Sequence, residues 1–478
     1  MTLSDDCQAR TSTATWLGRA ATVAMLAALA GCATTLPVVS SSSGKAQSGR
    51  KPAVVTVAPT TSDGKRVLGV AESAVVVERI EKDTTSELLA RHLAYVEEHV
   101  ERPLLVGNRS RLLVDGPQTH EAMFKAIAAA RESIDLETYI LEAGELGDRL
   151  AELLIERRSH GVSVRVLYDG IGSLKTPKEY FERLAAADIA VCVFNPIKVT
   201  EDKPRLSIQN RDHRKILVVD QRVAFTGGIN ISGVYSSGSF GGSRTPSEET
   251  GWRDTHIELA GPVVAEFSRL FDSAWQAQNC EGAPAMRASP APKPAGNETM
   301  RVIAQDPHTG RNEVYVEVLS AIGHAEQRAW LTFGYFVPDP QTVAALKDAA
   351  ARGVDVRLMV PSKSDVWLTL YAGRSHYTDL IESGVRIFER REAVLHAKTA
   401  VIDGVWSTVG TSNLDWRSFV HNFEVNVVIL GVESARELED IFRRDLAAAD
   451  EVTLQAWRTR GLGSRIKETF ARIWAYYL

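Results

Sequence analysis

A sparse pattern of five residues occurs twice in this chain, and it constrains the fold more than any other feature. HRKILVVDQRVAFTGGIN covers residues 213–230, HAKTAVIDGVWSTVGTSN covers residues 396–413, and both follow H-x-K-x4-D-x6-G-x-x-N. The similarity extends upstream, where MFKAIAAARESIDLETYI corresponds to VEVLSAIGHAEQRAWLTFGYF. Solenoid repeats run to about 20–50 residues. A repeat on the present scale therefore predicts two duplicated domains.

The order of apolar and polar residues predicts the fold class. Runs rich in β-branched residues alternate with helical patterns, as in LGDRLAELLIERRSHG followed by VSVRVLYDG, which favours an α/β fold with a mixed or parallel sheet and helices on its faces. Ordered structure is expected from about Thr85 onwards. The Ala-, Pro- and Gly-rich stretch AQNCEGAPAMRASPAPKPAGNE marks a boundary. We predict a first domain at 85–285, a linker at 286–300 and a second domain at 301–478.

The N-terminal residues predict a targeting segment. The apolar run AATVAMLAALA at 20–30 is 11 residues long, shorter than the roughly 20 that span a bilayer and suited to a signal peptide. It leads into LAGC, ending at Cys32, which resembles the lipobox of bacterial lipoproteins. Residues 1–31 are therefore predicted to be a lipoprotein signal peptide and Cys32 the lipid-modified residue, with an ordinary secretory signal as the alternative.

The segment that follows predicts a spacer. Residues 32–84 are rich in Ser, Thr, Gly and Pro and have no apolar period, which is typical of a flexible tether. Ala33, rather than Asp, follows Cys32. A lipid-anchored protein of the cell envelope that faces the periplasm is expected, with the outer membrane favoured over the inner one.

Each copy of the motif predicts a β-hairpin that brings three polar side chains together. The shared aspartate lies in the turn, and Asp403-Gly404 is a strong turn signal. Side chains alternate along a strand, so the His and the Lys two residues later share one face, and the Asn follows the returning strand at the same end. The residues so placed are His213, Lys215 and Asn230 in the first copy and His396, Lys398 and Asn413 in the second.

An imidazole, an ammonium and an amide aimed at one point suit a phosphoryl group. Lys and Asn donate to its non-bridging oxygens, a neutral His attacks phosphorus, and a protonated His donates to the leaving alcohol. Each copy supplies one His, so the two copies are expected to meet across a pseudo-twofold axis and complete one active site. This chemistry needs no metal and no cofactor.

The doubled motif, together with GWRDTHIELAGPVV, YFVPD and NLDWRSFVHNFEVNVV, resembles the phospholipase D superfamily over about Leu105–Leu478. Within it the chain is similar to the bacterial cardiolipin synthases, especially the subgroup without an N-terminal pair of transmembrane helices. The resemblance implies two tandem αβα sandwich domains related by pseudo-twofold symmetry, with the active site at their interface.

The resemblance also implies roles for single residues. His213 is expected to be the nucleophile, which forms a phosphohistidine, and His396 the general acid and later base. Carboxylates that orient the histidines are expected at Glu424 and, in the first half, at Asp254 of GWRDTH. The residues expected to bind the phosphate are Lys215, Lys398, Asn230 and Asn413.

Two features of the motif leave alternatives open. The shared aspartates, Asp220 and Asp403, belong to the family's motif and are counted with the catalytic residues, but Asp favours such turns on conformational grounds alone. A structural role is therefore equally open. The family's G-S-x-N reads GG at 227–228 and GT at 410–411, so the first half is expected to lack a supporting hydroxyl.

The implied reaction is transphosphatidylation. A phosphatidyl group from phosphatidylglycerol would pass to the glycerol hydroxyl of a second lipid and give cardiolipin and glycerol, with phosphatidylethanolamine as a possible replacement for one lipid. The alternatives are a hydrolase that uses water, a phosphodiesterase or nuclease, and a non-enzymatic envelope scaffold. A net charge of −5 disfavours a nucleic-acid partner, and two intact motifs disfavour a scaffold. The oligomeric state stays open.

The C-terminal sequence SRIKETFARIWAYYL has an apolar helical face formed by Ile466, Phe470, Ile473, Trp474 and Tyr477. Basic residues lie off that face. A helix in the membrane interface and a final helix packed on the second domain are equally open predictions.

Three further segments carry weaker signals. The polar, Gly- and Ser-rich loop at 236–252 is predicted to border the mouth of the site and to gate the acceptor. Cys192, in the apolar run IAVCVF, is interpreted as a small buried hydrophobic residue. Cys280 lies in the expected linker region, and whether the two cysteines pair is left open.

Overall fold

The computed structural model describes residues 36–39, 75–76, 78–80, 86–197, 209–239, 251–282 and 293–478. The predicted signal peptide, Cys32 and most of the tether and of the 236–252 loop lie outside the described residues. The chain separates into the units Met1–Pro37 and Val38–Leu478. Residues 86–282 are called the first half and residues 293–478 the second half.

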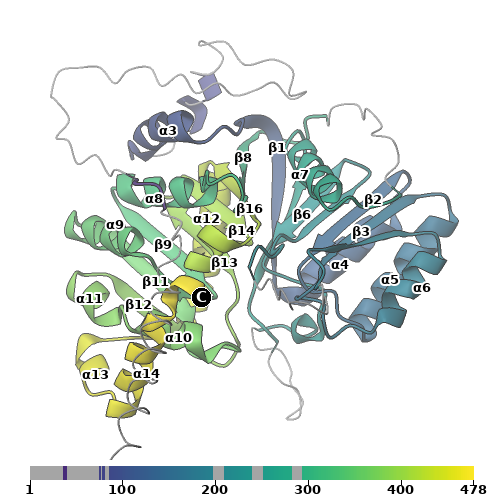
Figure 1. The fold of residues 1–478 in the computed structure, drawn as a ribbon. Helices are drawn as coiled ribbons and strands as arrows, with labels where there is room; N and C mark the ends of the chain where they lie inside the picture. Colours follow the sequence, from purple (N-terminus) through teal and green to yellow (C-terminus); the bar gives the residue numbers. More distant parts are fainter. Residues whose placement is uncertain are drawn as a thin grey trace, which may run out of the picture. The chain divides into compact units, whose positions relative to one another are not determined.

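Both halves are α/β structures (Figure 1). The strands of the first half are β1 (Leu105–Val114), β2 (Ser133–Thr138), β3 (Ser163–Asp169), β4 (Ala190–Phe194), β5 (Ile216–Val219), β6 (Val223–Gly227) and β7 (Thr255–Ala260). Its helices are α3 (Leu88–His99), α4 (Asp115–Ala128), α5 (Glu145–Ser159), α6 (Lys178–Ala186), α7 (Val264–Ala277) and the short η1 (Gly233–Tyr235).

The second half repeats this order and adds short elements. Its strands are β8 (Glu298–Gln305), β9 (Arg328–Phe333), β10 (Phe336–Val337), β11 (Asp355–Pro361), β12 (Arg386–Arg390), β13 (Lys398–Ile402), β14 (Trp406–Gly410), β15 (Leu414–Asp415), β16 (Glu424–Leu430) and β17 (Ala449–Glu451). Its helices are α8 (Glu313–His324), α9 (Pro340–Ala351), α10 (Trp367–Arg374), α11 (Tyr377–Glu382), α12 (Val432–Ala447), α13 (Leu454–Arg458), α14 (Leu462–Ile473), η2 (Arg417–His421) and η3 (Ala475–Tyr477).

The strand order has the symmetry that the doubled motif predicts. Outward from the antiparallel pair β1–β8, the first half runs β1-β7-β6-β5-β2-β3-β4 and the second runs β8-β16-β14-β13-β9-β11-β12. Equivalent strands thus take equivalent places on the two sides of the junction, which Figure 1 shows between β1 and β8. The α/β fold with two related halves is confirmed, and the parallel and antiparallel pairs make one mixed sheet.

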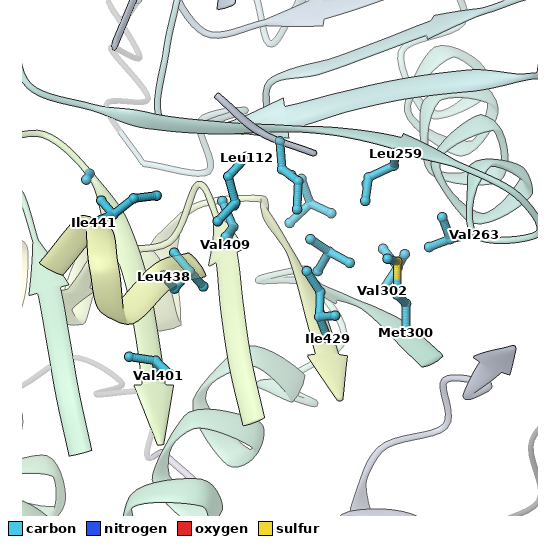
Figure 2. Packing of buried hydrophobic residues seen from close by; sticks show 14 of the residues in the cluster. Leu112, Leu259, Val263, Met300, Val302, Val401, Val409, Ile429, Leu438 and Ile441 are labelled. Carbon is cyan, nitrogen blue, oxygen red and sulfur yellow. The ribbon is translucent and has the colours of Figure 1, made fainter. Parts of the chain in front are cut away.

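The sequence ILVV of β5 shows why the motif strands are continuously apolar. Ile216 and Val218 belong to a central core, whereas Leu217 and Val219 belong to an outer core beneath α4 and α5. A strand covered on both faces buries every side chain instead of every second one. The central core joins the halves: Figure 2 shows Leu112 and Leu259 of the first half near Val409 and Ile429 of the second.

The first helix of the first predicted domain packs on the second half. The helix α3 packs on α8 of the second half, where His92 of α3 lies 3.0 Å from Ser320 Oγ and 3.1 Å from Glu317 Oε1. The domain limits at 85–285 and 301–478 stay predictions, but the contacts of α3 cross the boundary between them.

The boundaries of the helix before β2 differ from expectation. The sequence predicts a helix to about Ser133 and a strand over Ile134–Leu141, whereas α4 ends at Ala128 and β2 covers Ser133–Thr138. The carboxylate of Asp220 accepts hydrogen bonds from the backbone N–H groups of residues 131–133. These groups are therefore not available to continue the helix.

The structure also corrects the interpretation of Cys192. This residue of β4 forms a disulfide with Cys280, which follows α7, and the two Cα atoms lie 5.7 Å apart. The partners are separated by 88 positions in the sequence, so no local pattern brings them together. The fold does so because the end of α7 lies beside the edge strand β4 and shares a small core with it.

Candidate active site

The two histidines enter the site immediately before equivalent strands. The hairpin pattern predicts that each histidine lies within a strand. Instead, His213 precedes β5 and His396 precedes β13. Each backbone N–H donates to a carbonyl of the other half: His213 to Phe423 at 2.9 Å and His396 to Arg253 at 2.8 Å. These crossed hydrogen bonds hold each motif histidine against a segment of the other half, at the residue before Glu424 and the residue before Asp254.

The carboxylates cross in the same way. His213 Nδ1 lies 3.0 Å from both oxygens of Glu424, and His396 Nδ1 lies 2.8 Å from Oδ2 of Asp254. Each imidazole is thus oriented by a carboxylate of the opposite half. A carboxylate at Nδ1 favours the tautomer with its proton there, which leaves Nε2 to face a substrate. The sequence indicated both carboxylates but not this exchange between the halves.

The two lysines are buried and symmetrically placed. Lys215 Nζ donates to the carbonyl of His213 at 2.6 Å, and Lys398 Nζ donates to that of His396. Burial lowers the pKa of Lys215 to about 7 and that of Lys398 to about 8. An anionic ligand would therefore raise the pKa of both lysines, because it favours their charged form.

The two asparagines fix the loops that close the site. Asn230 Oδ1 accepts from the N–H of Ile140, and Asn413 Oδ1 accepts from the N–H of Tyr335, both at 3.2 Å. The amides, both histidines and residues from both halves line one cavity of about 410 Å³. Its lining includes Tyr139, Trp252, Tyr335, Arg417, Tyr477 and Leu478. The structure thus brings together the His, Lys and Asn residues of both motifs.

The shared aspartates lie elsewhere. Asp220 and Asp403 follow β5 and β13 at the ends opposite the histidines, and both have left-handed φ angles, 51° and 50°. Each carboxylate accepts backbone N–H groups, at residues 131–133 and 326–328 respectively. Of the two roles that the sequence left open for these aspartates, this placement favours the structural one. They tie the hairpin turn to the start of the neighbouring strand.

The two His–carboxylate pairs differ in their electrostatics. Burial, with Lys215 and Lys398 adding to it, lowers the pKa of His213 well below its usual value, and burial raises the pKa of Glu424 to about 7. Burial and Lys398 also lower the pKa of His396, but Asp254 opposes them.

Asp254 itself stays ionised. Burial would raise the pKa of Asp254, but its interactions with His396 and Lys398 outweigh burial and hold that pKa below its usual value. The pair His396–Asp254 is therefore the better of the two at holding a proton on its imidazole, and His213 is the better neutral nucleophile.

The surroundings of the carboxylates differ too. Thr411 Oγ1 donates to Glu424, whereas the equivalent Gly228 has no side chain. A Cβ at Gly228 would overlap with the carboxylate of Asp254. Glycine at this position therefore leaves the space that the Asp254 side chain occupies. The first half lacks the supporting hydroxyl, as expected, and Tyr235 Oη instead lies 3.1 Å from Nδ1 of His396.

Sequence reasoning missed the aromatic and arginine residues of the site. The rings of Tyr139 and His213 are 5.1 Å apart, those of Tyr335 and His396 5.8 Å, and those of Trp252 and His396 5.3 Å. A signal existed for the tyrosines, because each is the second-to-last residue of the repeated segment that lies upstream of the motif. Arg417, four residues after Asn413, has Val234 as its first-half equivalent.

The family profile described as "Cardiolipin synthase, PLD-like domain" matches residues 123–271 and 318–446, one stretch in each half. The chain belongs to this family. It is 38% identical over 369 residues to cardiolipin synthase A of Pseudomonas aeruginosa, covering 76% of this chain and 73% of that protein. It is 34% identical over 388 residues to a cardiolipin synthase of Geobacillus thermodenitrificans, covering 80% and 74%.

A solved structure shares the fold of this family member. The phosphatidylserine synthase of Haemophilus influenzae superposes with a TM-score of 0.60 and 13% sequence identity, covering 81% of this chain and 98% of that one. The similarity concerns the arrangement of strands and helices. It supports the two-part α/β architecture described above.

The described ranges contain neither a candidate metal cluster nor a candidate membrane span. Across the described ranges, no group of three or more His, Cys, Asp or Glu side chains is placed to hold a metal ion. Within the same ranges, no helix combines the length and the apolar character that crossing a bilayer requires.

Proposed function

We propose that this chain forms cardiolipin by transferring a phosphatidyl group between two phospholipids through a covalent intermediate on His213. The observation that carries the proposal is the pair of histidines in one cavity, each held at Nδ1 by a carboxylate of the opposite half. Family membership supplies the reaction class, and the electrostatics of the two pairs support the assignment of roles below.

In the first step Nε2 of His213 attacks the phosphorus of phosphatidylglycerol. The bond from phosphorus to the glycerol oxygen breaks, and His396 gives that oxygen its proton, so free glycerol leaves. The low pKa of His213 keeps it neutral and nucleophilic. Ionised Asp254 stabilises the protonated form of His396, which a general acid requires.

In the second step the glycerol hydroxyl of another phosphatidylglycerol, or of a lipid that replaces it, displaces His213. Its proton passes to His396, its oxygen bonds to phosphorus, and the bond from phosphorus to Nε2 breaks. Cardiolipin leaves and both histidines return to their starting protonation states. Water in place of the lipid hydroxyl would give phosphatidic acid, which is the hydrolase alternative.

We assign the phosphate of the donor lipid to Lys215, Lys398, Asn230 and Asn413. The two ammonium groups would offset the negative charge on the non-bridging oxygens, and the two amide NH₂ groups would donate hydrogen bonds to them. Arg417 adds a positive charge to the cavity from the second half alone. We assign it the phosphate of the acceptor lipid, which a lipid carries and water lacks.

We further propose that the protein is anchored at Cys32 in the cell envelope, faces the periplasm, and favours the outer membrane. Support comes from the disulfide Cys192–Cys280, since such bonds persist in oxidising compartments. Mass spectrometry of the N-terminal peptide after membrane fractionation tests this. A peptide that starts before residue 32, or an unmodified Cys32, would refute the anchor.

The deciding experiment follows labelled phosphatidylglycerol in mixed micelles containing a chelator. We expect cardiolipin and glycerol from the wild type and neither from His213→Ala. Arg417→Gln should shift the products from cardiolipin towards phosphatidic acid, and Lys363→Gln, on an exposed loop residue outside the cavity lining, is the matched control. Phosphatidic acid as the sole wild-type product would move the chain to the hydrolases. Cleavage of a generic phosphodiester without lipid turnover would overturn the lipid assignment.

A further inference from the structure

The large apolar side chains that are exposed between residues 86 and 478 lie mostly on or directly beside α10 and α14. Between residues 86 and 478, the exposed ones of the described ranges are Leu174, Val234, Val366, Trp367, Leu462, Ile466, Phe470, Ile473 and Trp474. Single exposed apolar residues are normal in soluble proteins. A contiguous group marks a site of interaction with another apolar body.

The helix α14 carries most of this group. Leu462, Ile466, Phe470 and Ile473 recur at helical spacing and are 73%, 61%, 50% and 69% exposed. The opposite face is the one that packs, with Ala471 buried beside α10 in a small core. Figure 1 shows α14 alongside α10. Of the two predictions for this sequence, the helix packs on the second half but leaves its apolar face exposed.

This face is continuous with the mouth of the cavity. The rings of Phe470 on α14 and Trp367 on α10 stack at 6.5 Å. Val366, next to Trp367, lines the cavity that holds both histidines, as do Tyr477 and Leu478 at the end of the chain. An apolar body seated on α14 would therefore extend to the opening of the site.

The first half contributes an equivalent residue. Leu174 follows β3, and Val366 follows the equivalent strand β11. Both side chains are exposed, at 66% and 37%, and the loop of Leu174 contributes Ile171 to the cavity wall. The two halves thus present apolar side chains on the two loops that border one opening.

The exposed charges on α14 itself are basic. Arg465, Lys467 and Arg472 are exposed on the helix, whereas its one acidic residue, Glu468, is buried and paired with Arg460. A helix with an apolar face and a basic border suits the surface of an anionic bilayer, where the apolar side chains enter the acyl boundary and the cations meet lipid phosphates.

We propose that Leu174, Val366, Trp367, Leu462, Ile466, Phe470, Ile473 and Trp474 form one docking surface for an anionic phospholipid bilayer, which seats the mouth of the cavity on the membrane. We call it the rim surface. The proposal rests on the proposed function for the identity of the lipid. It adds that the fold itself binds the bilayer and orients the site, whatever anchor the N-terminal segment provides.

The test compares two forms of one substrate. The full chain acts on vesicles of phosphatidylglycerol and phosphatidylethanolamine, and separately on dihexanoyl phosphatidylglycerol below its critical micelle concentration. The variant Ile466→Glu/Phe470→Glu should lower kcat/KM on vesicles by about tenfold or more and leave that on the monomeric lipid within about twofold. The matched control, Ala185→Glu/Ala344→Glu, adds the same charge at exposed positions of α6 and α9 and should change neither value.

Other outcomes would overturn the proposal. Equal turnover of the variant and the control on vesicles would remove any role of the surface in docking. An equal loss on both substrates would indicate damage to the site itself. Conversion of a dimer to a monomer by the variant, with unchanged vesicle turnover, would show that the surface binds a second copy of the chain.

A second measurement separates this proposal from the proposed function. Brominated phosphatidylglycerol in vesicles should quench tryptophan fluorescence of the wild type, and the quenching should fall by about half in Trp367→Phe/Trp474→Phe. Quenching without turnover of any lipid would refute the proposed function and support the rim surface. Turnover of the monomeric lipid without quenching would support the proposed function and refute the rim surface.

Discussion

The two halves of the site share a scaffold and differ in electrostatics. Both place His, Lys and Asn on equivalent elements, and both send a carboxylate across the junction to the other half's imidazole. The carboxylate is Glu424 beside Thr411 in one case and Asp254 beside Gly228 in the other. The duplicated scaffold therefore places an imidazole in the same way in each half. A few neighbouring residues then determine which imidazole is neutral and which one holds a proton.

This comparison separates two properties that one motif cannot distinguish. The motif fixes where an imidazole lies, while the carboxylate from the other half fixes how readily that imidazole holds a proton. Glu424 has a pKa raised to about 7 by burial, and Asp254 has one held below its usual value against burial.

Removal of either histidine should abolish cardiolipin formation, but in different ways. His213→Ala should lower turnover by about 10⁴-fold and leave no covalent intermediate, because no nucleophile remains. His396→Ala should still form a phosphohistidine from a phosphatidyl ester of p-nitrophenol, which needs no acid to leave. Mass spectrometry of the trapped protein checks this. A covalent adduct in His213→Ala but not in His396→Ala would reverse the two assignments.

The two carboxylates should differ in importance. Asp254→Asn should lower kcat by about 10²–10³-fold, because the imidazolium of His396 loses its ionised partner. Glu424→Gln should cost about tenfold below pH 7, where a carboxyl of pKa about 7 is largely protonated in the wild type. Kinetics of both variants between pH 5.5 and 8.5 measure the difference. Equal losses at every pH would show that the two pairs are electrostatically equivalent.

The positions beside the carboxylates should also behave unequally. Gly228→Ala places a Cβ against Asp254 and should lower kcat by about 10–100-fold by displacing His396. Thr411→Val removes one hydroxyl donor to Glu424 and should cost about threefold to tenfold. Circular dichroism and the thermal midpoint control for misfolding. A larger loss in Thr411→Val than in Gly228→Ala would contradict the packing argument.

The buried lysines predict a pH limit on phosphate binding. Their pKa values of about 7 and about 8 lie below the ordinary lysine value, so both lose their positive charge as the pH rises through that range. Affinity for tungstate, an anion that mimics phosphate, should fall about tenfold per pH unit between pH 7 and 8 and about a hundredfold per unit above pH 8, where both lysines of the empty site are neutral. Calorimetry in two buffers measures affinity and proton uptake together. A flat affinity between pH 7 and 9.5 would show that the lysines stay charged in the empty site.

The disulfide belongs to the first half alone, and its loss should affect stability far more than turnover. Cys192→Ser/Cys280→Ser should lower the free energy of unfolding by about 2–4 kcal/mol, because the bond closes a long loop. Turnover at 25 °C should stay within about twofold, since neither cysteine lines the cavity. Thermal unfolding with and without reductant provides the measurement. An unchanged midpoint in the double variant would rule out the bond's contribution.

The fold class and the His, Lys and Asn residues of the two motifs could be predicted because both leave repeated patterns in the sequence. Strand and helix patterns repeat along the chain, and His, Lys and Asn recur at one spacing in 213–230 and 396–413. The roles proposed for these residues combine the chemistry that a phosphoryl group requires with what the family resemblance implies.

The remaining features depend on contacts between distant residues. His213 and Glu424 are 211 positions apart, and His396 and Asp254 are 142 positions apart, so the exchange of carboxylates has no local pattern. The disulfide and the packing of α3 on α8 are distant contacts as well. The exposed face of α14 is visible as a periodicity, but only the fold decides which side of the helix is covered.

The turn aspartates change how an inactive descendant of this chain would look. Asp220 and Asp403 tie hairpins to neighbouring strands, so a chain that had lost the reaction but kept the fold would still need them. In such a pseudoenzyme, selection would no longer act on the histidines. The turn aspartates would be retained, as would Gly228, which leaves space for Asp254. A genome survey that scores the motif as one unit would count such chains as enzymes, whereas the histidines scored alone would separate the two.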